Sequence, residues 1–380
     1  MRVLVLCHEL PPVGGGAATV SAALAEEYAA AGCGVTVATM AWDGLPRAEV
    51  TAGGVEVVRL ACGRRRREAA SLPEAVRWAG RALAWAGRRH RHAPFDVVHA
   101  HFVMPAGLAA ALLGARRRPR LPFVLTAHGS DVPGYDPSRF PRVHRLVAPA
   151  WRRVCAAAAS LVSPSRSLRR LLAAAGVRRP TLVIPNPVDA DRFVPLPKEA
   201  RILLAGRLVE RKGFDVLLEA LRGVELPGWV VDVVGDGPQR DRLERLAAEV
   251  PVPVRFHGWV GQDDPRLPEL FGRAGLFVFP TRWENLPIAP LEAMAAGCAV
   301  VASDVEGVVE AVGDAGRLVP VGDRAALAAA VRGLAADEAA RRELGRRARR
   351  RVESRFARPA VAARYLGELE RAAAVAEERS

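Results

Sequence analysis

The sequence predicts an α/β protein made of two similar, doubly wound halves. Its 380 residues exceed the roughly 100–200 residues of an average domain, so two domains are expected. In each half, short apolar runs typical of buried parallel strands alternate with stretches of helical spacing. The halves are separated by Pro185–Pro197, which contains four prolines, and we expect the linker between the domains there.

The N-terminal half opens with a strand, a glycine-rich loop and a helix. Arg2–Cys7 is almost entirely apolar, as in a strand buried on both faces, and the loop Glu9–Gly16 follows it. Thr19–Ala31 has helical spacing, and Gly32 and Gly34 are expected to end that helix. The further strands expected are Val35–Met40, Val55–Leu60, Asp96–Ala100, Phe123–Ala127, Leu161–Ser163 and Thr181–Ile184. The further helices expected are Ser71–Arg89, Pro105–Ala115 and Phe140–Ala158.

The same alternation restarts after the linker. The expected strands are Arg201–Ala205, Trp229–Val234, Val254–His257 and Leu276–Phe279. The expected helices are Phe214–Arg222, a helix ending at Ala248, Pro290–Ala296, Ala325–Ala335 and Asp337–Glu353. Because ligands of open α/β sheets bind at the carboxyl ends of the strands, we expect a ligand site in a cleft lined by those ends.

Two cations lie in the loop between the first strand and the first helix of the C-terminal half. Arg207 and Lys212 stand in Ala205-Gly-Arg-Leu-Val-Glu-Arg-Lys-Gly213. A strand–loop–helix turn directs loop side chains and helix N–H groups to one spot, where two cations can neutralise a diphosphate. A solvated basic loop is the alternative interpretation.

Two carboxylates eight positions apart, Glu284 and Glu292, mark a second candidate segment. Pro290 is expected at the first position of a short helix, with Glu292 in its first turn and Gly297 just after its end. Glu284 then lies on the preceding loop. Backbone N–H groups of Leu286–Leu291 can bind phosphate oxygens, and both carboxylates can accept hydrogen bonds from sugar hydroxyls. The alternatives are a helix-stabilising acid for Glu292 and a surface charge for Glu284.

Four motifs of the C-terminal half resemble those of retaining glycosyltransferases of family 4, which have the GT-B fold. They are Gly206–Gly213, Gly235–Pro238, Phe256–Val260, and the Glu284/Glu292 pair followed by Ala-Met-Ala-x-Gly. The N-terminal half adds Pro11–Gly16, Thr126–Asp131, Ser163–Ser165 and Ile184–Asn186, so the resemblance spans nearly the whole chain. Two departures occur: Pro187 replaces a usual glycine, and Asn285-Leu-Pro287 replaces a frequent Gly-Phe-Gly, which leaves the sugar preference open.

The resemblance implies two Rossmann-like domains facing across a cleft. Residues 1–190 would form the acceptor-side domain, joined by a crossing helix at about 357–380, and residues 198–356 would bind the nucleotide sugar. Arg207 and Lys212 would stabilise the leaving diphosphate, Glu284 would hold the donor sugar, and Glu292 would hold the ribose. His128 would lie beside the donor sugar and complete the catalytic set with Glu284, Arg207 and Lys212. The remaining donor-binding residues implied are Gly15, Gly16, Trp259, Val260, Asn285, Leu286, Pro287 and Leu291.

The chemistry expected at this site needs neither a cofactor nor a metal. The nucleotide sugar is a co-substrate, and the acceptor is a glycan, a lipid or a small molecule. No nucleophile–base pair is evident, and the one Asp-x-Asp triplet, Asp189-Ala-Asp191, falls in the linker. Arg207, Lys212 and a helix dipole would then carry the leaving charge. In the family this accompanies front-face displacement; a covalent role for Glu284 is the lesser alternative.

The charge of the chain and its cysteines bear on its partners and location. The formal net charge is +14, and the only lysines are Lys198 and Lys212. The N-terminal arginines, Arg64–Arg67, Arg116–Arg118 and those of a helix bearing Trp78 and Trp85, could meet an anionic membrane surface, although a core-packing helix is slightly favoured. No nucleic-acid-binding motif accompanies the charge, so a nucleic-acid partner is not expected.

The five cysteines are widely spaced and favour a location in the reducing cytoplasm. A peripheral position on the inner face of the membrane is left open.

The sequence leaves three competing interpretations: an epimerase acting on nucleotide sugars, an oxidoreductase and a non-catalytic nucleotide-sugar-binding protein. The Glu284/Glu292 pair argues against the epimerase. The glycines at 14–16 do not complete Gly-x-Gly-x-x-Gly, because Thr19 stands at the last position. The interpretation as an oxidoreductase is weaker for this reason. His99 and His101 lack a third metal ligand of suitable spacing, and we expect them to be polar residues at a strand end near the acceptor side.

Overall fold

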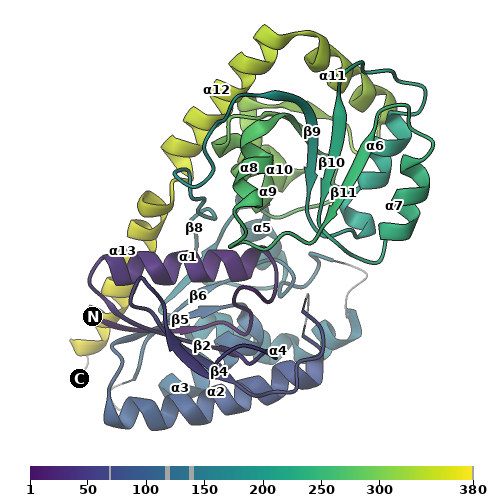
Figure 1. Cartoon of the computed structure of the whole chain (residues 1–380). Coiled ribbons are helices and arrows are strands. Elements are labelled where there is room, and N and C mark those ends of the chain that lie inside the picture. Colours follow the sequence, from purple (N-terminus) through teal and green to yellow (C-terminus); the bar gives the residue numbers. More distant parts are fainter. Residues whose placement is uncertain (68–69, 116–119, 137–140, 379–380) are drawn as a thin grey trace. The chain divides into compact units, whose positions relative to one another are not determined.

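A computed structural model of the chain describes residues 1–67, 70–115, 120–136 and 141–378. Arg116–Arg118 and Phe140, which entered the sequence predictions, lie outside this range. The internal contacts divide the chain into unit 1, Met1–Pro187 with Arg358–Ser380, and unit 2, Val188–Ala357 (Figure 1). The change from one unit to the other after Pro187 falls inside the proline-rich segment, where Val188 forms an isolated β-bridge to Ala357.

Unit 1 contains one eight-stranded sheet in the order β3-β4-β2-β1-β5-β6-β7-β8. Its strands are β1 (Arg2–Leu6), β2 (Gly34–Met40), β3 (Ala48–Val50), β4 (Glu56–Leu60), β5 (Val97–His101), β6 (Phe123–Thr126), β7 (Ser160–Ser163) and β8 (Thr181–Val183). All pairs are parallel except the short edge strand β3, which runs antiparallel to β4. The direction of the strand order changes between β1 and β5, so the loops after these two strands emerge side by side.

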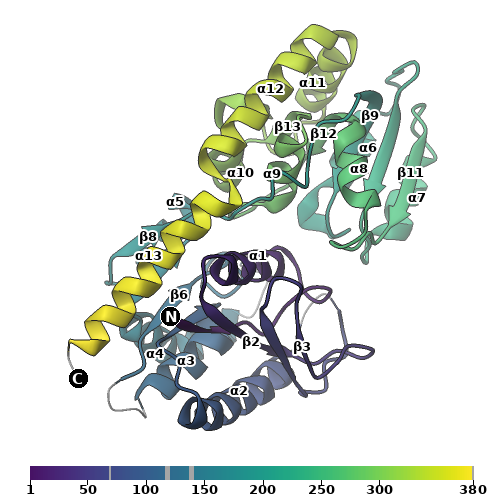
Figure 2. The same ribbon diagram turned by 60° about the vertical axis from the view of Figure 1, so that its left-hand side comes forward.

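Helices cover both faces of this sheet. They are α1 (Gly16–Ala30), α2 (Leu72–His92), α3 (Leu108–Ala115), α4 (Pro141–Ala157), α5 (Arg166–Ala174) and α13 (Arg358–Glu377), with a π-helical turn at Val103–Gly107. Figures 1 and 2 show α1 and α13 side by side, while α2, α3 and α4 pack with the main core on the opposite face. The C-terminal helix α13 is tied to unit 1 by Arg358, which pairs with Glu27 at 2.6 Å.

Unit 2 contains a six-stranded, fully parallel sheet in the order β11-β10-β9-β12-β13-β14. Its strands are β9 (Glu199–Ala205), β10 (Val230–Val234), β11 (Val254–Gly258), β12 (Ala274–Phe279), β13 (Ala299–Ser303) and β14 (Arg317–Val319). Its helices are α6 (Phe214–Ala220), α7 (Arg240–Ala247), α8 (Arg266–Arg273), α9 (Ile288–Ala295), α10 (Glu306–Val312), α11 (Arg324–Ala336) and α12 (Glu338–Arg355). One core lies beneath α8, α9, α10 and α12, and the other beneath α6, α7 and α11.

The α/β class and the alternation of elements are confirmed, and several details of the sequence prediction are wrong. Helix α1 begins at Gly16 rather than Thr19, because the N–H groups of a first helical turn need no partner within the helix and glycine is tolerated there. Gly34 opens β2 instead of ending the preceding helix. The elements missed by the sequence are β3, α5, α8, β13, α10 and β14. All six are short, from three to nine residues, so each shows only one or two full repeats of its own period.

Candidate functional site

The two loops expected to bind the ligand leave neighbouring strands of the unit 2 sheet. Gly206–Gly213 follows β9 and Thr281–Pro287 follows β12, and these strands are adjacent and parallel. Strands β10 and β11 extend the sheet on one side, and β13 and β14 extend it on the other. Such a reversal of strand order is where open α/β sheets bind ligands. The strand order therefore brings both loops to one place.

The backbones of the two loops touch directly. The N–H of Arg282 donates to the carbonyl oxygen of Arg211 at 2.8 Å, and the Thr281 hydroxyl donates to the same oxygen at 2.9 Å. Gly213 has φ +66°, and a Cβ atom there would lie 2.0 Å from the Pro280 carbonyl oxygen. Glycine alone permits both this φ angle and this approach. The cationic end of the first loop is thus fixed against the second loop.

Lys212, Arg211 and Glu284 form a largely buried charge cluster. Lys212 Nζ lies 2.5 Å, and Arg211 Nη1 2.7 Å, from the same Oε1 atom of Glu284. The side chains of Lys212 and Glu284 are only 12% and 8% exposed. Lys212 Nζ also lies 4.8 Å from the centre of the Phe279 ring, a favourable position for a cation. Two cations share one carboxylate, which leaves net positive charge for an anionic ligand.

The charges of the cluster keep Glu284 ionised. Burial raises the pKa of Glu284, but the charges of Lys212 and Arg211 together outweigh burial and hold that pKa below its ordinary value. Burial lowers the pKa of Lys212 against the opposing charge of Glu284, and the cations Arg211 and Arg207 act in the same direction as burial. Arg207 is therefore close enough to act on Lys212. A carboxylate held ionised in this way can accept hydrogen bonds from hydroxyl groups.

Helix α9 begins at Ile288, two residues earlier than the sequence predicted, with Pro287 as its N-cap. Pro290 is therefore the third helical residue rather than the first; the first turn tolerates it because its N–H groups have no helical partner. Two of the four positions at the helix start are prolines without an N–H. The N–H groups of Ile288 and Ala289 remain available to an anion, whereas that of Leu291 bonds within the helix.

Glu292 lies in the second turn of α9, not in the first turn as predicted, because the helix starts earlier. Its side chain is buried, and the amide of Gln262 donates to Glu292 Oε1 at 3.5 Å. Arg192 Nη1 donates in turn to Gln262 Oε1 at 3.1 Å. Burial raises the pKa of Glu292 to about 7, against the charge of Arg192. A buried acid beyond the first turn is poorly explained by stabilisation of the helix dipole.

The Phe256–Val260 segment, with the donor-binding candidates Trp259 and Val260, forms the carboxyl end of β11 and the residues directly after it. Trp259 is 39% exposed, while Val260 is buried. Gly258 has φ +67°, and its carbonyl oxygen accepts from the N–H of Gly235 at 2.8 Å. An exposed indole beside a glycine-lined turn offers a flat apolar surface for an aromatic ring.

In unit 1, the glycine-rich loop after β1 is held by two arginines. The fully buried side chain of Arg64 donates to the carbonyl oxygens of His8 and Arg67 at 3.4 and 3.0 Å. The same Arg67 oxygen accepts from the N–H of Gly14 at 3.0 Å. Arg67 Nε donates to the carbonyl oxygen of Pro12 at 2.8 Å. Arg64 and Arg67 therefore anchor the loop, and the prediction that Arg64 belongs to a basic surface was wrong because its side chain is buried.

Gly15 and Gly16 form the start of α1 rather than an independent loop. Gly15 is the N-cap, and its carbonyl oxygen accepts from the N–H groups of Ala18 and Thr19 at 2.9 and 3.2 Å. Gly16 is the first helical residue, so no side chain screens the first turn of the helix at either position. A ligand oxygen can approach the backbone there closely.

His128 follows β6 and meets His101 from the neighbouring strand β5. His101 Nδ1 and His128 Nε2 are 3.0 Å apart, and the two rings are stacked with centroids 5.2 Å apart. Asp131 fixes the backbone around this pair: its Oδ1 accepts from His128 N at 2.9 Å and its Oδ2 accepts from Val103 N at 2.6 Å. His99 and His101 are indeed at the end of a strand, and both are completely buried.

Helix α2 is the helix that was expected to form a basic surface with two tryptophans. Its tryptophans instead pack toward the core of unit 1. Trp78 is fully buried and Trp85 packs against the same core. This confirms the core-packing interpretation of the helix. The residues of α2 left exposed include Leu72, Val76, Arg77, Arg81 and Arg88.

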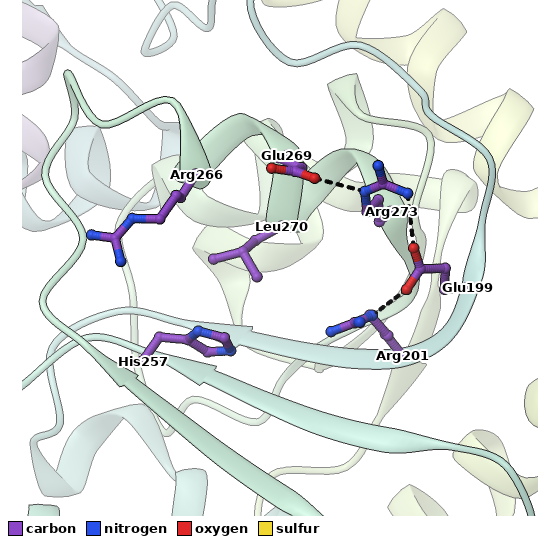
Figure 3. Close-up of a pocket in the computed structure, with 7 residues that line it drawn as sticks. All are labelled: Glu199, Arg201, His257, Arg266, Glu269, Leu270 and Arg273. Atoms are coloured by element: carbon purple, nitrogen blue, oxygen red, sulfur yellow. Dashed lines mark hydrogen bonds and ion pairs between the residues drawn. The ribbon is translucent and has the colours of Figure 1, made fainter.

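Figure 3 shows a cavity of about 400 Å³ elsewhere in unit 2, between α8 and the face of the sheet. Its lining residues are Glu199, Arg201, His257, Arg266, Glu269, Leu270 and Arg273. Arg273 pairs with Glu199 and with Glu269, each at 2.9 Å. Arg201 pairs with Glu199 at 2.5 Å. None of the candidate site residues lines this cavity, and its charges largely neutralise one another.

Residues 1–67, 70–115, 120–136 and 141–378 contain no group of three or more His, Cys, Asp or Glu side chains placed to hold a metal ion. Among the helices of the same residues, none is both long enough and apolar enough to cross a bilayer.

The sequence analysis did not include Arg211 and Gln262, which contact the two candidate carboxylates, or Arg192, which binds Gln262. Arg211 directly precedes Lys212 and could have been included with it as a third cation of the loop. The sequence around Gln262 and Arg192 does not indicate a site. The two residues are 70 positions apart, and only the fold brings them into contact.

Comparison with protein families covers nearly the whole chain. Residues 14–192 match the family described as Glycosyltransferase Family 4, and residues 189–351 match Glycosyl transferases group 1. The second match contains the Arg207–Lys212 loop and both carboxylates, and the first contains Gly14–Gly16 and His128.

Curated relatives with similar sequences bear names that describe different transfer reactions. The lipopolysaccharide core biosynthesis glycosyltransferase LpsE of Rhizobium meliloti is 34% identical over 50% of this chain and 58% of its own length. The 2-deoxystreptamine N-acetyl-D-glucosaminyltransferase of Streptomyces fradiae is 32% identical over 80% of this chain and 78% of its own. The glycogen synthase of Mycobacterium tuberculosis is 31% identical over 94% of this chain and 91% of its own.

Solved structures share the fold over the full chain. Sucrose-phosphate synthase from Thermosynechococcus elongatus superposes with a TM-score of 0.83 at 24% identity, covering 98% of both chains. The Anabaena protein HepE, in complex with UDP-glucose, superposes with a TM-score of 0.76 at 19% identity, covering 97% of this chain and all of the other. The sequence motifs, the family matches and the two parallel sheets agree: this chain is a glycosyltransferase of family 4 with the GT-B fold.

Proposed function

We propose that the protein transfers a sugar from a nucleoside-diphosphate sugar to an acceptor hydroxyl with retention of anomeric configuration. The observation that carries this proposal is the buried Lys212–Arg211–Glu284 cluster beside the start of α9. It combines cations for a diphosphate with a carboxylate for sugar hydroxyls at the switch point of a parallel sheet. The structure of HepE with UDP-glucose provides a related fold with such a donor.

The diphosphate would be bound by Arg207, Lys212 and the start of α9. The N–H groups of Ile288 and Ala289 contribute partial positive charge in addition to the two side chains. Asn285, Leu286, Pro287 and Leu291 shape this phosphate subsite. The preorganised donors stabilise charge on the leaving diphosphate as the sugar–phosphate bond breaks, so neither a metal nor another cofactor is required in this proposal.

Glu284 would accept hydrogen bonds from hydroxyls of the donor sugar and hold the anomeric carbon in place. Glu292, positioned by Gln262, would do the same for the ribose hydroxyls. Trp259 and Val260 would contact the nucleobase. The proposed bond changes take place on one face of the sugar: the anomeric carbon–phosphate oxygen bond breaks while the acceptor oxygen bonds to that carbon. The proton of the acceptor hydroxyl passes to the departing phosphate oxygen.

The proposed roles in unit 1 concern the donor sugar and phosphates. His128 would donate a hydrogen bond to the donor sugar, and the side-chain-free start of α1 at Gly15 and Gly16 would contact the donor phosphates or the acceptor. The acceptor remains a glycan, lipid or small molecule, because the relatives named above differ in what their names say they act on.

A cytoplasmic protein with peripheral membrane contact is also proposed, on charge alone. Because Trp78 is buried, the contact would rest on Arg77, Arg81 and Arg88 of α2, with Leu72 and Val76 at 53% and 62% exposure. Co-sedimentation with anionic and with neutral liposomes tests it. If equal amounts of the protein sediment with both kinds of liposome, the proposed contact with an anionic membrane is wrong.

A panel of UDP-, GDP- and ADP-sugars tests the donor assignment. The preferred donor should raise the melting temperature, because a ligand that binds only the folded state stabilises it. The anomeric configuration of the product, read by proton NMR with that donor, then tests retention. An inverted product would contradict the front-face mechanism, and no response to any nucleotide sugar would contradict the donor class.

A further inference from the structure

His101 and His128 form a pair of hydrogen-bonded imidazoles that the proposed reaction uses only in part. His101 ends β5 and is paired in register with Thr126 of β6, two residues before His128. This register places His101 Nδ1 3.0 Å from His128 Nε2. One of these two nitrogens must carry the shared proton, since a neutral imidazole has one donor and one acceptor.

Burial keeps both rings neutral. It lowers the pKa of His128 to about 3, assisted by the charge of His8, and it lowers the pKa of His101 well below its ordinary value, assisted by His99 and His128. With one proton on each ring, only two arrangements satisfy the 3.0 Å contact. Either His101 Nδ1 donates to His128 Nε2, or His128 Nε2 donates to His101 Nδ1.

The other nitrogen of His101 distinguishes the two arrangements. His101 Nε2 is buried and has no hydrogen-bond partner. If His128 were the donor, the proton of His101 would sit on Nε2 as a buried N–H without an acceptor, which folded proteins strongly avoid. If His101 Nδ1 is the donor, Nε2 is a buried acceptor without a donor, and folded proteins tolerate this more readily than a buried N–H without an acceptor. The first arrangement is therefore the more stable one.

We propose that His101 is a positioning residue that donates from Nδ1 to His128 Nε2 and so holds His128 as its Nδ1–H tautomer. In this state His128 Nε2 is occupied as an acceptor, and the single ring proton of the neutral His128 is on Nδ1. A general-base role for His128 Nε2 is thereby excluded. The role in the reaction rests on the proposed function, in which His128 contacts the donor sugar; the tautomer does not.

The surroundings hold the pair rigid. Asp131 accepts from the backbone N–H groups of both His128 and Val103, so one carboxylate joins the loops after β6 and β5. Phe102, the residue after His101, is held at φ +75°, and its ring centre lies 4.8 Å from that of His128. A non-glycine residue in this region signals a backbone fixed by its neighbours. His101 and His128 thus have little freedom to exchange roles.

Two substitutions at His101 and one matched control test the proposal. Asparagine at 101 can place an N–H near the position of Nδ1, whereas leucine cannot donate. We expect long-range nitrogen-15 NMR to show His128 as the Nδ1–H tautomer in the wild type and in His101→Asn, and as a mixture in His101→Leu. We expect kcat to fall about tenfold in His101→Leu with KM little changed, as when an orienting partner of a functional histidine is lost.

The matched control is His99→Leu. It removes an equally buried histidine of β5 whose hydrogen bonds go to Tyr28 and Thr126, and it should leave the His128 tautomer unchanged.

An Nε2–H tautomer in the wild type, or an unchanged tautomer in His101→Leu, would overturn the proposal. An altered tautomer with unchanged kcat would overturn the positioning role. If His101→Leu fails to fold, the wild-type spectrum and His101→Asn still decide the tautomer. A wild type with the expected tautomer but without transfer from any nucleotide sugar would contradict the proposed function and leave the tautomer standing.

Discussion

Lys212 Nζ lies 2.5 Å from Glu284 Oε1 and joins two loops that are 72 residues apart in the sequence. The pair sits where the order of strands reverses in the unit 2 sheet, with the start of α9 close behind Glu284. A cation for phosphate and a carboxylate for sugar are therefore prepositioned against each other before any ligand binds. Donor binding should require both charges.

Removing the lysine should weaken donor binding and catalysis without unfolding the protein. Lys212→Met leaves Glu284 paired with Arg211, so we expect the fold to survive, while kcat/KM falls by about 10²–10³ through loss of charge stabilisation. The only other lysine provides the control. Lys198 Nζ donates to the carbonyl oxygens of Gly272 and Ala296, each at 2.7 Å, at the ends of α8 and α9. Lys198→Met should lower stability yet leave the donor affinity of the folded protein intact; equal loss of affinity in both variants would argue against a specific phosphate contact.

Glu292 should make stability depend on pH in a predictable direction. Its pKa is raised by burial from 4.5 to about 7, so the folded state binds a proton that the unfolded state releases at lower pH. This contribution is complete below pH 4.5 and is lost as the pH rises through 7, by about 3 kcal/mol at 1.36 kcal/mol per pKa unit. Glu292→Gln should therefore be more stable relative to the wild type at pH 8 than at pH 4, as measured by urea unfolding. A stability difference that is independent of pH would show that Glu292 titrates normally.

The contact between the two loops should tolerate only glycine at position 213. Gly213 and Gly223 have nearly the same φ, +66° and +69°, but a Cβ atom clashes with the Pro280 carbonyl only at Gly213. Gly223→Ala carries the backbone strain alone, about 1 kcal/mol. Gly213→Ala adds the clash, for a total of about 3 kcal/mol or more. Chemical denaturation compares the two variants, and equal losses would mean that the loops do not touch as described.

The glycine loop of unit 1 should depend on Arg64 but not on its neighbour. Arg64 has no exposed side-chain surface and lies 3.5 Å from Glu9, so Arg64→Met removes the donor to this carboxylate and to the carbonyl oxygens of His8, Arg66 and Arg67. We expect a loss of about 3 kcal/mol in stability and a lower kcat in the molecules that remain folded. The exposed Arg66 is the control. A loss in Arg66→Met equal to that in Arg64→Met would mean that basic charge, rather than anchoring, is what matters.

The sequence predicted the class of fold, because strands buried on both faces and helices between them leave distinct apolar patterns. It could not predict that the loops after β9 and β12 meet, since strand order in the sheet is a long-range property. The starts of α1 and α9 were placed too late for one reason: glycine and proline weaken a helical pattern, yet both are tolerated in a first turn.

The sequence predicted those site residues whose type and spacing within one segment indicate their chemistry. It could not predict contacts that depend on how two strands pair. Arg207, Lys212, Glu284 and Glu292 stand in recognisable segments, so their types and spacing suggested a diphosphate and hydroxyl ligands. The period of a strand places His99 and His101 on one face, but only the register of β5 against β6 shows that His101 meets His128. The burial of Arg64 within an apparent run of surface charge likewise had no local signal.

A crystal structure of the protein with a bound nucleoside diphosphate tests the central claim most directly. The account predicts diphosphate oxygens within hydrogen-bond distance of Arg207, of Lys212 Nζ and of the N–H groups of Ile288 and Ala289, with ribose hydroxyls on Glu292. A diphosphate bound elsewhere, for example in the cavity of Figure 3, would contradict it. So would undiminished binding of the same nucleotide to the Arg207→Met, Lys212→Met double variant.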